Sequence, residues 1–226
     1  LRDCLEGCWD GPDEGIWEVR GGRQHFTHSK VMAWVAADRA ALAVERFGLD
    51  GPVERWRRLA EAIRADVLAH GVRADGAFRQ AYGNDALDAS LLLVPLVGFL
   101  PPDDARVRAT VEAIERELTE DGFVLRYRTE HTADGLPGDE GAFLLCTFWL
   151  ADCLHLLGRT TDARALYEKL VALRNDVGLL SEECDPSSGR LLGNLPQAFS
   201  HVALVNTAMY LGDEGSHAAT RRARRH

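Results

Sequence analysis

Hydrophobic positions in this chain recur every three or four residues, which is the period of an α-helix with one buried face. The pattern predicts helices over residues 27–47, 52–70, 86–99, 103–119, 141–157, 161–173 and 197–211. Gly48 is expected to end the first helix as a C-cap, and Asp103 or Asp104 to cap the fourth. Strict alternation of apolar and polar residues, which indicates a half-buried strand, is almost absent. The sequence therefore predicts an all-α protein.

Two kinds of helix alternate along the chain. The first, third, fifth and seventh predicted helices are strongly apolar, whereas the three between them have one polar face. A double-layered toroid of helical hairpins requires this alternation, because its outer ring covers the inner ring and itself faces water. Long loops over 71–85, 120–140 and 175–196 lead from outer to inner helices and could build a site at one mouth of the ring. A solenoid of hairpins is the structural alternative, although no residue signature repeats at a fixed period.

Composition and charge narrow the class of protein. The 226 residues are 46% hydrophobic and 27% charged, which is typical of a soluble globular protein of one large domain or two small ones. A net charge of -9 disfavours nucleic acid as the partner, because phosphate contacts need a basic surface. No stretch of about twenty residues is free of charged side chains, so the sequence predicts no membrane-spanning helix. Five cysteines without metal-ligand spacing favour a reducing, cytoplasmic compartment, with Cys146 and Cys153 as small core residues.

Two loop segments carry carboxylates in settings suited to sugar chemistry. Residues 13–22 place Glu18 directly after Trp17 on a glycine-rich backbone. An indole offers a flat apolar face to a sugar ring, and it can desolvate a neighbouring carboxyl and so raise its pKa, as a general acid requires. Residues 180–189 place Glu182 and Glu183 before a turn that contains proline and glycine. The plain alternatives are a surface turn whose tryptophan caps the core and an ordinary acidic loop.

The two segments together indicate an inverting glycosidase. Such an enzyme uses one protonated carboxyl and one carboxylate set roughly 6.5–9.5 Å apart, which leaves room for the attacking water. The segments precede inner helices near opposite ends of the chain, and on a closed ring those ends can face each other. We therefore expect Glu18 and Glu182 to converge on a shared pocket.

Several blocks of the sequence resemble glycoside hydrolase family 15, which contains glucoamylases, glucodextranases and bacterial trehalases. They are residues 13–21 (Asp-Glu-Gly-Ile-Trp-Glu-Val-Arg-Gly), 25–30 (His-Phe-Thr-His-Ser-Lys), 126–127 (Arg-Tyr) and 181–185 (Ser-Glu-Glu-Cys-Asp). The resemblance implies an (α/α)6 toroid, of which residues 1–211 would form about the second half of the catalytic domain. Residues 212–226 contain four arginines and are expected to be a solvated, disordered tail.

The resemblance also implies roles for individual residues. The glutamate directly after the tryptophan is the family's general acid, which corresponds to Glu18. The glutamate of the Ser-Glu stretch is its general base, which corresponds to Glu182, with Glu183 as the second candidate. The arginine of the Arg-Tyr pair contacts substrate near the cleaved bond, so Arg126 inherits a binding role and would position the sugar together with Trp17.

Three further polar residues are candidates for substrate binding. His28 and Lys30 could bind sugar hydroxyls or phosphate, although polar residues at the start of a helix are more often structural. Asp88 could accept hydrogen bonds from sugar hydroxyls if it faces the interior of the ring. None of these positions follows from the spacing alone.

The predicted reaction is inverting hydrolysis of terminal α-glucosidic bonds in α-glucans or maltooligosaccharides, with hydrolysis of α,α-trehalose as the alternative. The substrate would be an oligosaccharide or a disaccharide, and the mechanism requires no metal or organic cofactor. An alternative of another class is a non-catalytic helical fragment or interaction module. An incomplete ring would expose apolar surface on an inner helix, which favours association.

Overall fold

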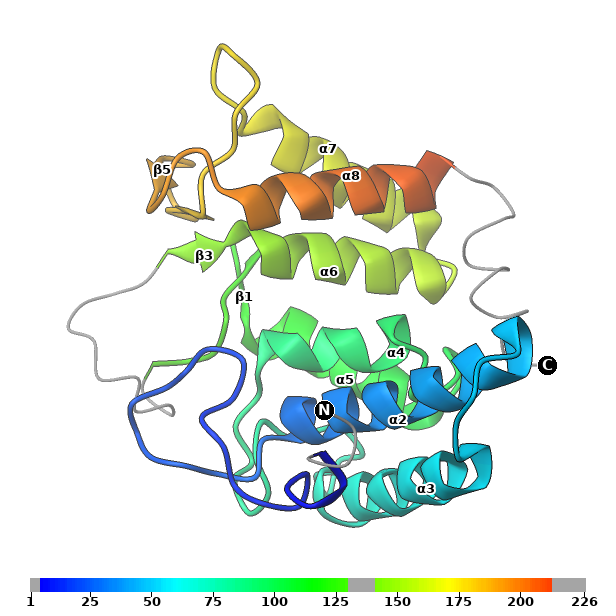
Figure 1. Ribbon diagram of the computed structural model, residues 1–226. Coiled ribbons are helices and arrows are strands. Elements are labelled where there is room, and N and C mark those ends of the chain that lie inside the picture. The colour runs from blue at the N-terminus through cyan, green and yellow to red at the C-terminus, as the bar shows by residue number, and fades with distance from the viewer. Residues whose placement is uncertain (1–4, 130–140, 213–226) are drawn as a thin grey trace.

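The computed structural model describes residues 5–129 and 141–212, and helices dominate this part of the chain (Figure 1). The helical elements are α2 (Thr27–Phe47), α3 (Val53–His70), the 3₁₀ helix η1 (Ala89–Leu92), α4 (Leu93–Leu96), α5 (Ala105–Glu117), α6 (Leu144–Leu156), α7 (Thr160–Ala172) and α8 (Ala198–Gly212). In the described residues no helix combines the length and the hydrophobicity needed to cross a membrane.

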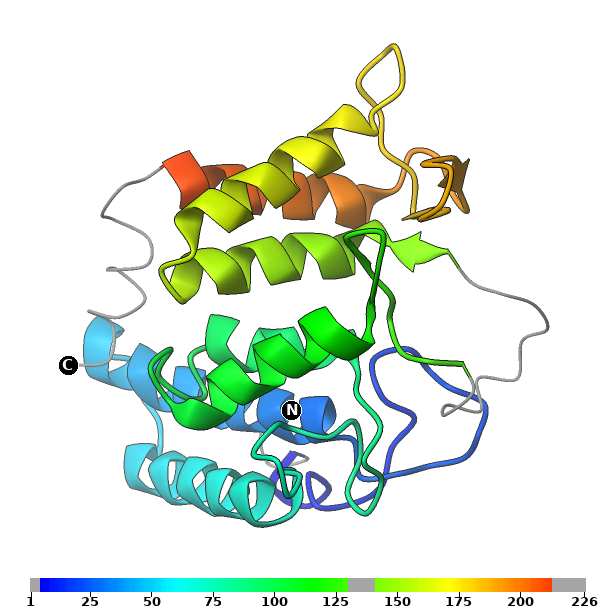
Figure 2. The ribbon, with the colours of Figure 1, turned by 180° about the vertical axis from the view of Figure 1, so that it is seen from behind.

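The helices form two layers in the predicted alternation. α2, η1 with α4, α6 and α8 lie side by side in one layer (Figure 1), and α5 and α7 lie behind it, as the view from the opposite side shows (Figure 2). α3 packs on α2, α5 on η1 and α6, and α7 on α6, so each amphipathic helix covers an apolar neighbour. The predicted all-α architecture and the division into inner and outer helices are confirmed.

The helix ends follow from local chemistry at several points. α2 ends where Gly48 adopts a left-handed φ of 62° and its N–H bonds the carbonyl of Val44, as expected of a C-cap. α5 begins after Asp104, whose side chain accepts a hydrogen bond from the Arg106 N–H at 2.9 Å. Both predicted caps are confirmed.

The helix predicted over 86–99 is wrong in both length and form. Its helical part consists only of the short elements η1 and α4, because Asp88 is extended (φ −146°, ψ 135°) and Gly98 has a positive φ of 77°. Pro95 explains the interruption, since a proline ring clashes with the carbonyl four residues earlier and offers no N–H. The prediction of burial is confirmed, because Leu91 and Leu92 are fully buried.

Two small antiparallel sheets were not predicted. β1 (Thr119–Glu120) pairs with β2 (Phe123–Val124), and β3 (Ala142–Phe143), β4 (Glu183–Cys184) and β5 (Leu191–Leu192) form a three-stranded sheet. Each strand has two residues, which is too short for alternation to show in a sequence. The three-stranded sheet matters for the site, because Phe143 pairs with Glu183 and so joins the start of α6 to the acidic loop.

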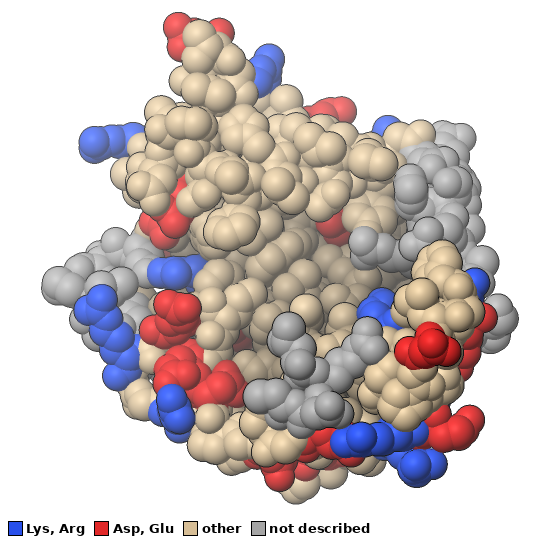
Figure 3. All heavy atoms as spheres, viewed as in Figure 1, with Lys and Arg blue, Asp and Glu red and all other residues tan. Residues whose placement is uncertain are grey.

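One face of α8 is apolar and exposed to solvent. Phe199, Val202, Val205 and Met209 are each more than half exposed, and few charged side chains lie over α8 and α6 on this face (Figure 3). An exposed inner-helix surface was expected of a partial ring. Residues 213–226 of the predicted tail lie outside the described part of the chain. Residues 130–140 of the predicted loop lie outside it too.

Candidate active site

The segment that carries Glu18 is a tightly held loop. Asp13 and Gln24 exchange two backbone hydrogen bonds at 2.8 and 2.9 Å across its base, and the Gly15 N–H bonds the Asp13 carboxylate at 2.7 Å. Gly15 is required at its position, because its φ is 73° and a Cβ there would lie 3.0 Å from the Phe26 ring. The loop therefore has little freedom before it reaches Glu18.

Glu18 projects from this loop between two inward-facing neighbours. Trp17 packs against the main core, Val19 is buried with Phe26 and Tyr127, and the Glu18 side chain is exposed. Glu18 has a φ of 51°, a left-handed conformation that is uncommon for a residue with a side chain and is found preferentially at functional sites. The predicted shielding of this carboxyl by Trp17 is wrong for the described residues, because the indole turns inward.

Trp17 is fixed from several sides. Its indole N–H donates to both carboxylate oxygens of Asp88, each at 3.0 Å. Its ring lies edge-on to Phe143 with 5.8 Å between the centroids, and 6.2 Å from Trp149. The Arg126 guanidinium carbon lies 5.4 Å from the Trp17 ring centroid, within cation–π range. Trp17 is therefore an anchor of the loop, and its contact with a sugar stays a prediction.

Asp88 is buried and makes its hydrogen bonds within the protein. Its side chain is only 2% exposed, and besides Trp17 it accepts from the Ser90 N–H at 2.8 Å and from the Gln80 amide at 3.0 Å. Each oxygen accepts two hydrogen bonds, so its acceptor capacity is filled within the protein. These contacts hold the Trp17 loop, and contact between Asp88 and a sugar stays a prediction.

Arg126 lies beside the same cluster. Its backbone carbonyl accepts a hydrogen bond from the Ala89 N–H at 2.8 Å, and its half-buried guanidinium lies 5.4 Å from the ring centroids of both Trp17 and Tyr127. The structure thus brings together three of the predicted residues, Trp17, Asp88 and Arg126. The role of Arg126 in binding substrate stays a prediction.

Glu182 lies at the opposite side of this arrangement and is half-buried. Its Oε2 accepts hydrogen bonds from the backbone N–H and the side-chain amide of Asn194, at 3.2 and 3.0 Å. These two hydrogen bonds tie the Glu182 carboxylate to Asn194. Gly193 has a φ of 71°, and a Cβ there would lie 2.9 Å from Glu182 Oε2, so this glycine permits the close approach.

Glu183 has a structural contact that Glu182 lacks. Its Oε2 accepts a hydrogen bond from the Gly141 N–H at 3.2 Å, directly before β3. This contact stabilises the pairing of β3 and β4 and favours Glu182 over Glu183 as the residue for chemistry.

The two carboxylate segments meet at the N-terminal end of α6. The Phe143 ring contacts Trp17, and the next residue, Leu144, donates its N–H to the Glu182 carbonyl at 3.0 Å. Both segments lie at the same end of the helices, on the left of Figure 1. Both segments thus contact neighbouring residues at the start of α6, whereas the convergence of Glu18 and Glu182 on a shared pocket stays a prediction.

Lys30 and His28 are more enclosed than predicted. The Lys30 side chain is 2% exposed, its Nζ donates to the Gly11 carbonyl, and it lies 3.9 Å from Asp13 Oδ2. Burial lowers its pKa. Lys30 thus holds the N-terminal segment, and its contact with a sugar stays a prediction. Burial also lowers the pKa of His28, whose Nε2 has no hydrogen-bond partner within the described residues. Substrate binding by His28 stays a prediction.

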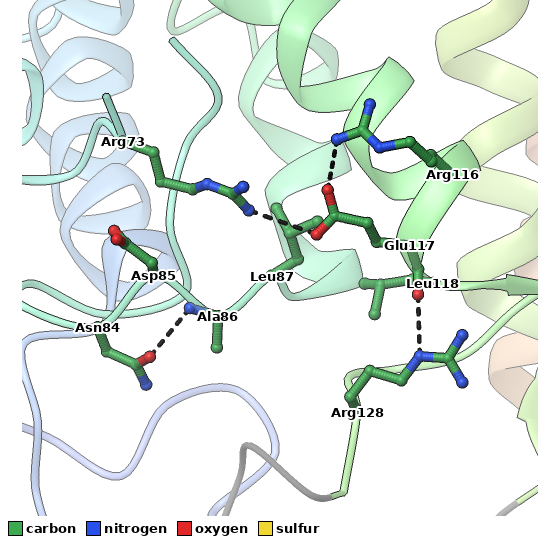
Figure 4. A pocket seen from close by; sticks show the side chains of 9 residues that line it. All are labelled: Arg73, Asn84, Asp85, Ala86, Leu87, Arg116, Glu117, Leu118 and Arg128. Atoms are coloured by element: carbon green, nitrogen blue, oxygen red, sulfur yellow. Dashed lines mark hydrogen bonds and ion pairs between the residues drawn. The ribbon is translucent and has the colours of Figure 1, made fainter. Parts of the chain in front are cut away.

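A cavity of about 950 Å³ lies at the C-terminal end of α5 and was not predicted (Figure 4). It is lined by Arg73, Asn84, Asp85, Ala86, Leu87, Arg116, Glu117, Leu118 and Arg128. Glu117 lies among the arginines: Arg73 is 3.6 Å from its carboxylate, Arg116 pairs with it, and Arg128 Nε donates to its carbonyl at 2.9 Å. Neither Glu18 nor Glu182 lines this cavity.

Other predicted residues have structural roles. Cys146 and Cys153 are buried in the core, and His201 accepts a hydrogen bond from the Leu180 N–H at 3.1 Å. Within residues 5–129 and 141–212, no three His, Cys, Asp or Glu side chains lie close enough together to hold a metal ion.

A two-layered array of helices with loop carboxylates at one end is the arrangement of the α/α-toroid glycosidases. The chain belongs to glycosyl hydrolases family 15, whose family model matches residues 1–209. It is 55% identical over 203 residues to a trehalase of Mycobacterium tuberculosis. The match covers 90% of this chain and 30% of that protein. A trehalase of Thermoplasma volcanium is 41% identical over 206 residues, covering 90% of this chain and 33% of its own length.

Solved structures confirm the fold. A glycosidase in complex with glucose superimposes with a TM-score of 0.78 at 24% identity, over 93% of this chain and 58% of the other. A bacterial glucoamylase complexed with acarbose gives a TM-score of 0.77 at 15% identity, over 92% and 36%. The (α/α)6 fold predicted from the sequence is confirmed. The chain spans only about a third of the length of the trehalases that it matches.

Proposed function

We propose that the protein containing this chain hydrolyses an α-glucosidic bond with inversion, using Glu18 as general acid and Glu182 as general base. The observation that carries the proposal is the meeting of their two segments at the start of α6, through Phe143 and Leu144. Segments that are distant in the sequence thereby share one rigid support, as a reaction that needs two groups at a fixed separation requires.

The proton transfers follow from the two environments. Protonated Glu18 donates its proton to the glycosidic oxygen as the bond to the anomeric carbon breaks. Ionised Glu182 accepts a proton from the water that attacks that carbon from the opposite face. The hydrogen bonds from Asn194 hold the Glu182 carboxylate in place, and the exposure of Glu18 leaves it accessible to a leaving group. Solvent then returns both carboxyls to their starting states.

We propose α,α-trehalose as the substrate. The matched relatives that support this choice bear the name trehalase and are up to 55% identical to the chain. Terminal hydrolysis of α-glucans or maltooligosaccharides is the second candidate, because the family whose Arg-Tyr loop the Arg126-Tyr127 pair resembles also contains glucoamylases. A non-catalytic interaction module is the third, and the open apolar face of α8 is the feature that favours it.

One set of assays separates these candidates. Glucose release from trehalose, maltose and isomaltose by the intact protein identifies the substrate, and the absence of release from all three would favour the interaction module. NMR at early times identifies the stereochemistry, because inverting hydrolysis of trehalose yields equal amounts of α- and β-glucose, whereas retention would yield α-glucose alone.

Variants then test the two roles. We expect Glu18→Gln and Glu182→Gln each to lower kcat by about 100- to 10,000-fold, the range for loss of a general acid or base. Glu112→Gln makes the same chemical change at an exposed position of α5 and is expected to leave kcat unchanged. Near-normal activity of Glu18→Gln would remove the assignment of the acid, and a Glu183→Gln variant less active than Glu182→Gln would transfer the role of base.

A further inference from the structure

We propose that Asp88 is a positioning residue, which fixes the loop of the general acid against Arg126. This inference rests on the proposed function, in which Glu18 is the acid. Asp88 holds Trp17, the residue before Glu18, by two hydrogen bonds of 3.0 Å. The adjoining Ala89 N–H donates to the Arg126 carbonyl at 2.8 Å. The Arg126 guanidinium carbon lies 5.4 Å from the centroid of the Trp17 ring. These contacts link Trp17 to Asp88, the residue after Asp88 to Arg126, and Arg126 back to Trp17.

Asp88 makes more hydrogen bonds than a helix cap requires. Asp104 offers a comparison, because its side chain too accepts from a backbone N–H two residues ahead, at Arg106. Within the described residues, all hydrogen bonds to the Asp104 side chain come from Arg106. Asp88 makes the equivalent local bond to Ser90 and in addition reaches Gln80 and Trp17, the latter 71 positions away. Capping explains only the bond to Ser90.

The burial of Asp88 makes its contacts hard to replace. Gln80 also ties this point to α2, because its carbonyl accepts the Thr27 N–H at 2.9 Å. Both Asp88 oxygens accept from the Trp17 indole, so in Asp88→Asn the new amide N–H₂ would face the indole N–H, donor against donor, in a site closed to water. Trp17 must then move, and Glu18 moves with it because the two residues share a peptide bond.

Two substrates distinguish a misplaced acid from a general loss of structure. Trehalose needs a proton on its leaving oxygen, whereas fluoride leaves α-glucosyl fluoride without one. In the intact protein we expect Asp88→Asn to lower kcat for trehalose by about 100-fold, which is typical of a displacement near 1 Å, and to affect α-glucosyl fluoride only a few-fold. KM for the fluoride should stay near the parent value.

Trp17→Phe is the second variant, because it removes only the indole N–H and keeps an aromatic ring. We expect the same selective loss on trehalose, and we expect the double variant to be no worse than the more impaired single variant, since both changes break the same hydrogen bond. Asp104→Asn is the matched control, because it alters the cap of α5, which takes no part in these contacts. We expect it to leave the ratio of the kcat values for the two substrates unchanged.

Equal losses on the two substrates, or additive effects of the two variants, would overturn the inference. If Asp88→Asn does not fold, an unchanged substrate ratio in Trp17→Phe would overturn it by itself. Failure of the proposed function has a different signature, because Glu18→Gln would then show no selective loss on trehalose, whatever the Asp88 variant does.

Discussion

Gly193 is a position where a single methyl group should disturb one predicted catalytic residue. In Gly193→Ala, the new Cβ would lie 2.9 Å from Glu182 Oε2 and 3.0 Å from Glu182 Cβ. The second contact is the decisive one, because Glu182 Cβ lies next to the backbone and cannot rotate away. Relief to an ordinary contact of 3.4 Å or more requires a shift of a few tenths of an ångström in Glu182 or in the loop that carries it.

Gly189 provides a matched control in the same loop. Its φ of 68° is close to the 71° of Gly193, but a Cβ at Gly189 would meet only Leu173, at 3.7 Å. Both alanine variants carry the left-handed backbone penalty of about 1–2 kcal/mol, so both should lower the free energy of unfolding by a similar amount. Only Gly193→Ala should also displace Glu182.

The assay compares kcat for trehalose and the melting temperature in the two variants. We expect kcat of Gly193→Ala to fall about tenfold below that of Gly189→Ala, less than the ~100-fold typical of a 1 Å misplacement. KM should change little, because the displaced group acts on water. Equal kcat in the two variants would refute the reasoning, since the base would then tolerate the clash or take no part in the reaction.

Three further predictions concern stability and reactivity. Burial lowers the pKa of His28 below its ordinary 6.5, so the unfolded chain binds a proton first as the pH falls, and the melting temperature of the parent should drop below about pH 6.5 more steeply than that of His28→Gln. Thr147→Val removes the acceptor of the buried Val124 N–H, at 2.9 Å, and should cost about 1–3 kcal/mol in urea unfolding, whereas Thr119→Val should cost less. Cys8 is exposed, whereas burial raises the pKa of Cys184 to about 12 and that of Cys153 well above its usual value; alkylation followed by peptide mass spectrometry should label Cys8 first and those two only on unfolding.

Local sequence determined the helices with clear ends. α2 and α3 occupy the predicted positions almost to the residue, because Gly48 and Pro52 are stop and start signals that act through their own backbone geometry. The prediction failed over 86–99, where the apolar run outweighed Pro95 and Gly98. Hydrophobicity there indicated burial correctly, whereas the backbone form depended on the two residues that interrupt a helix.

Sequence also singled out Glu18 and Glu182, since a carboxylate after a tryptophan and a Ser-Glu stretch are local patterns with a family resemblance. It could not assign Asp88 or Lys30. Both are polar residues near the start of a helix, and their roles depend on partners elsewhere in the chain: Trp17 for Asp88, and Gly11 for Lys30.

The amino-acid sequence by itself determined the helical class, the alternation of inner and outer helices and the candidate carboxylates, because periodicity, caps and motifs are properties of neighbouring residues. Only the tertiary structure decided that Trp17 faces inward, that Asp88 is saturated with hydrogen bonds and that the segments of Glu18 and Glu182 contact Phe143 and Leu144. The physical reason is that burial and hydrogen-bond partners are set by segments that folding brings together, and no local pattern records which segments those are.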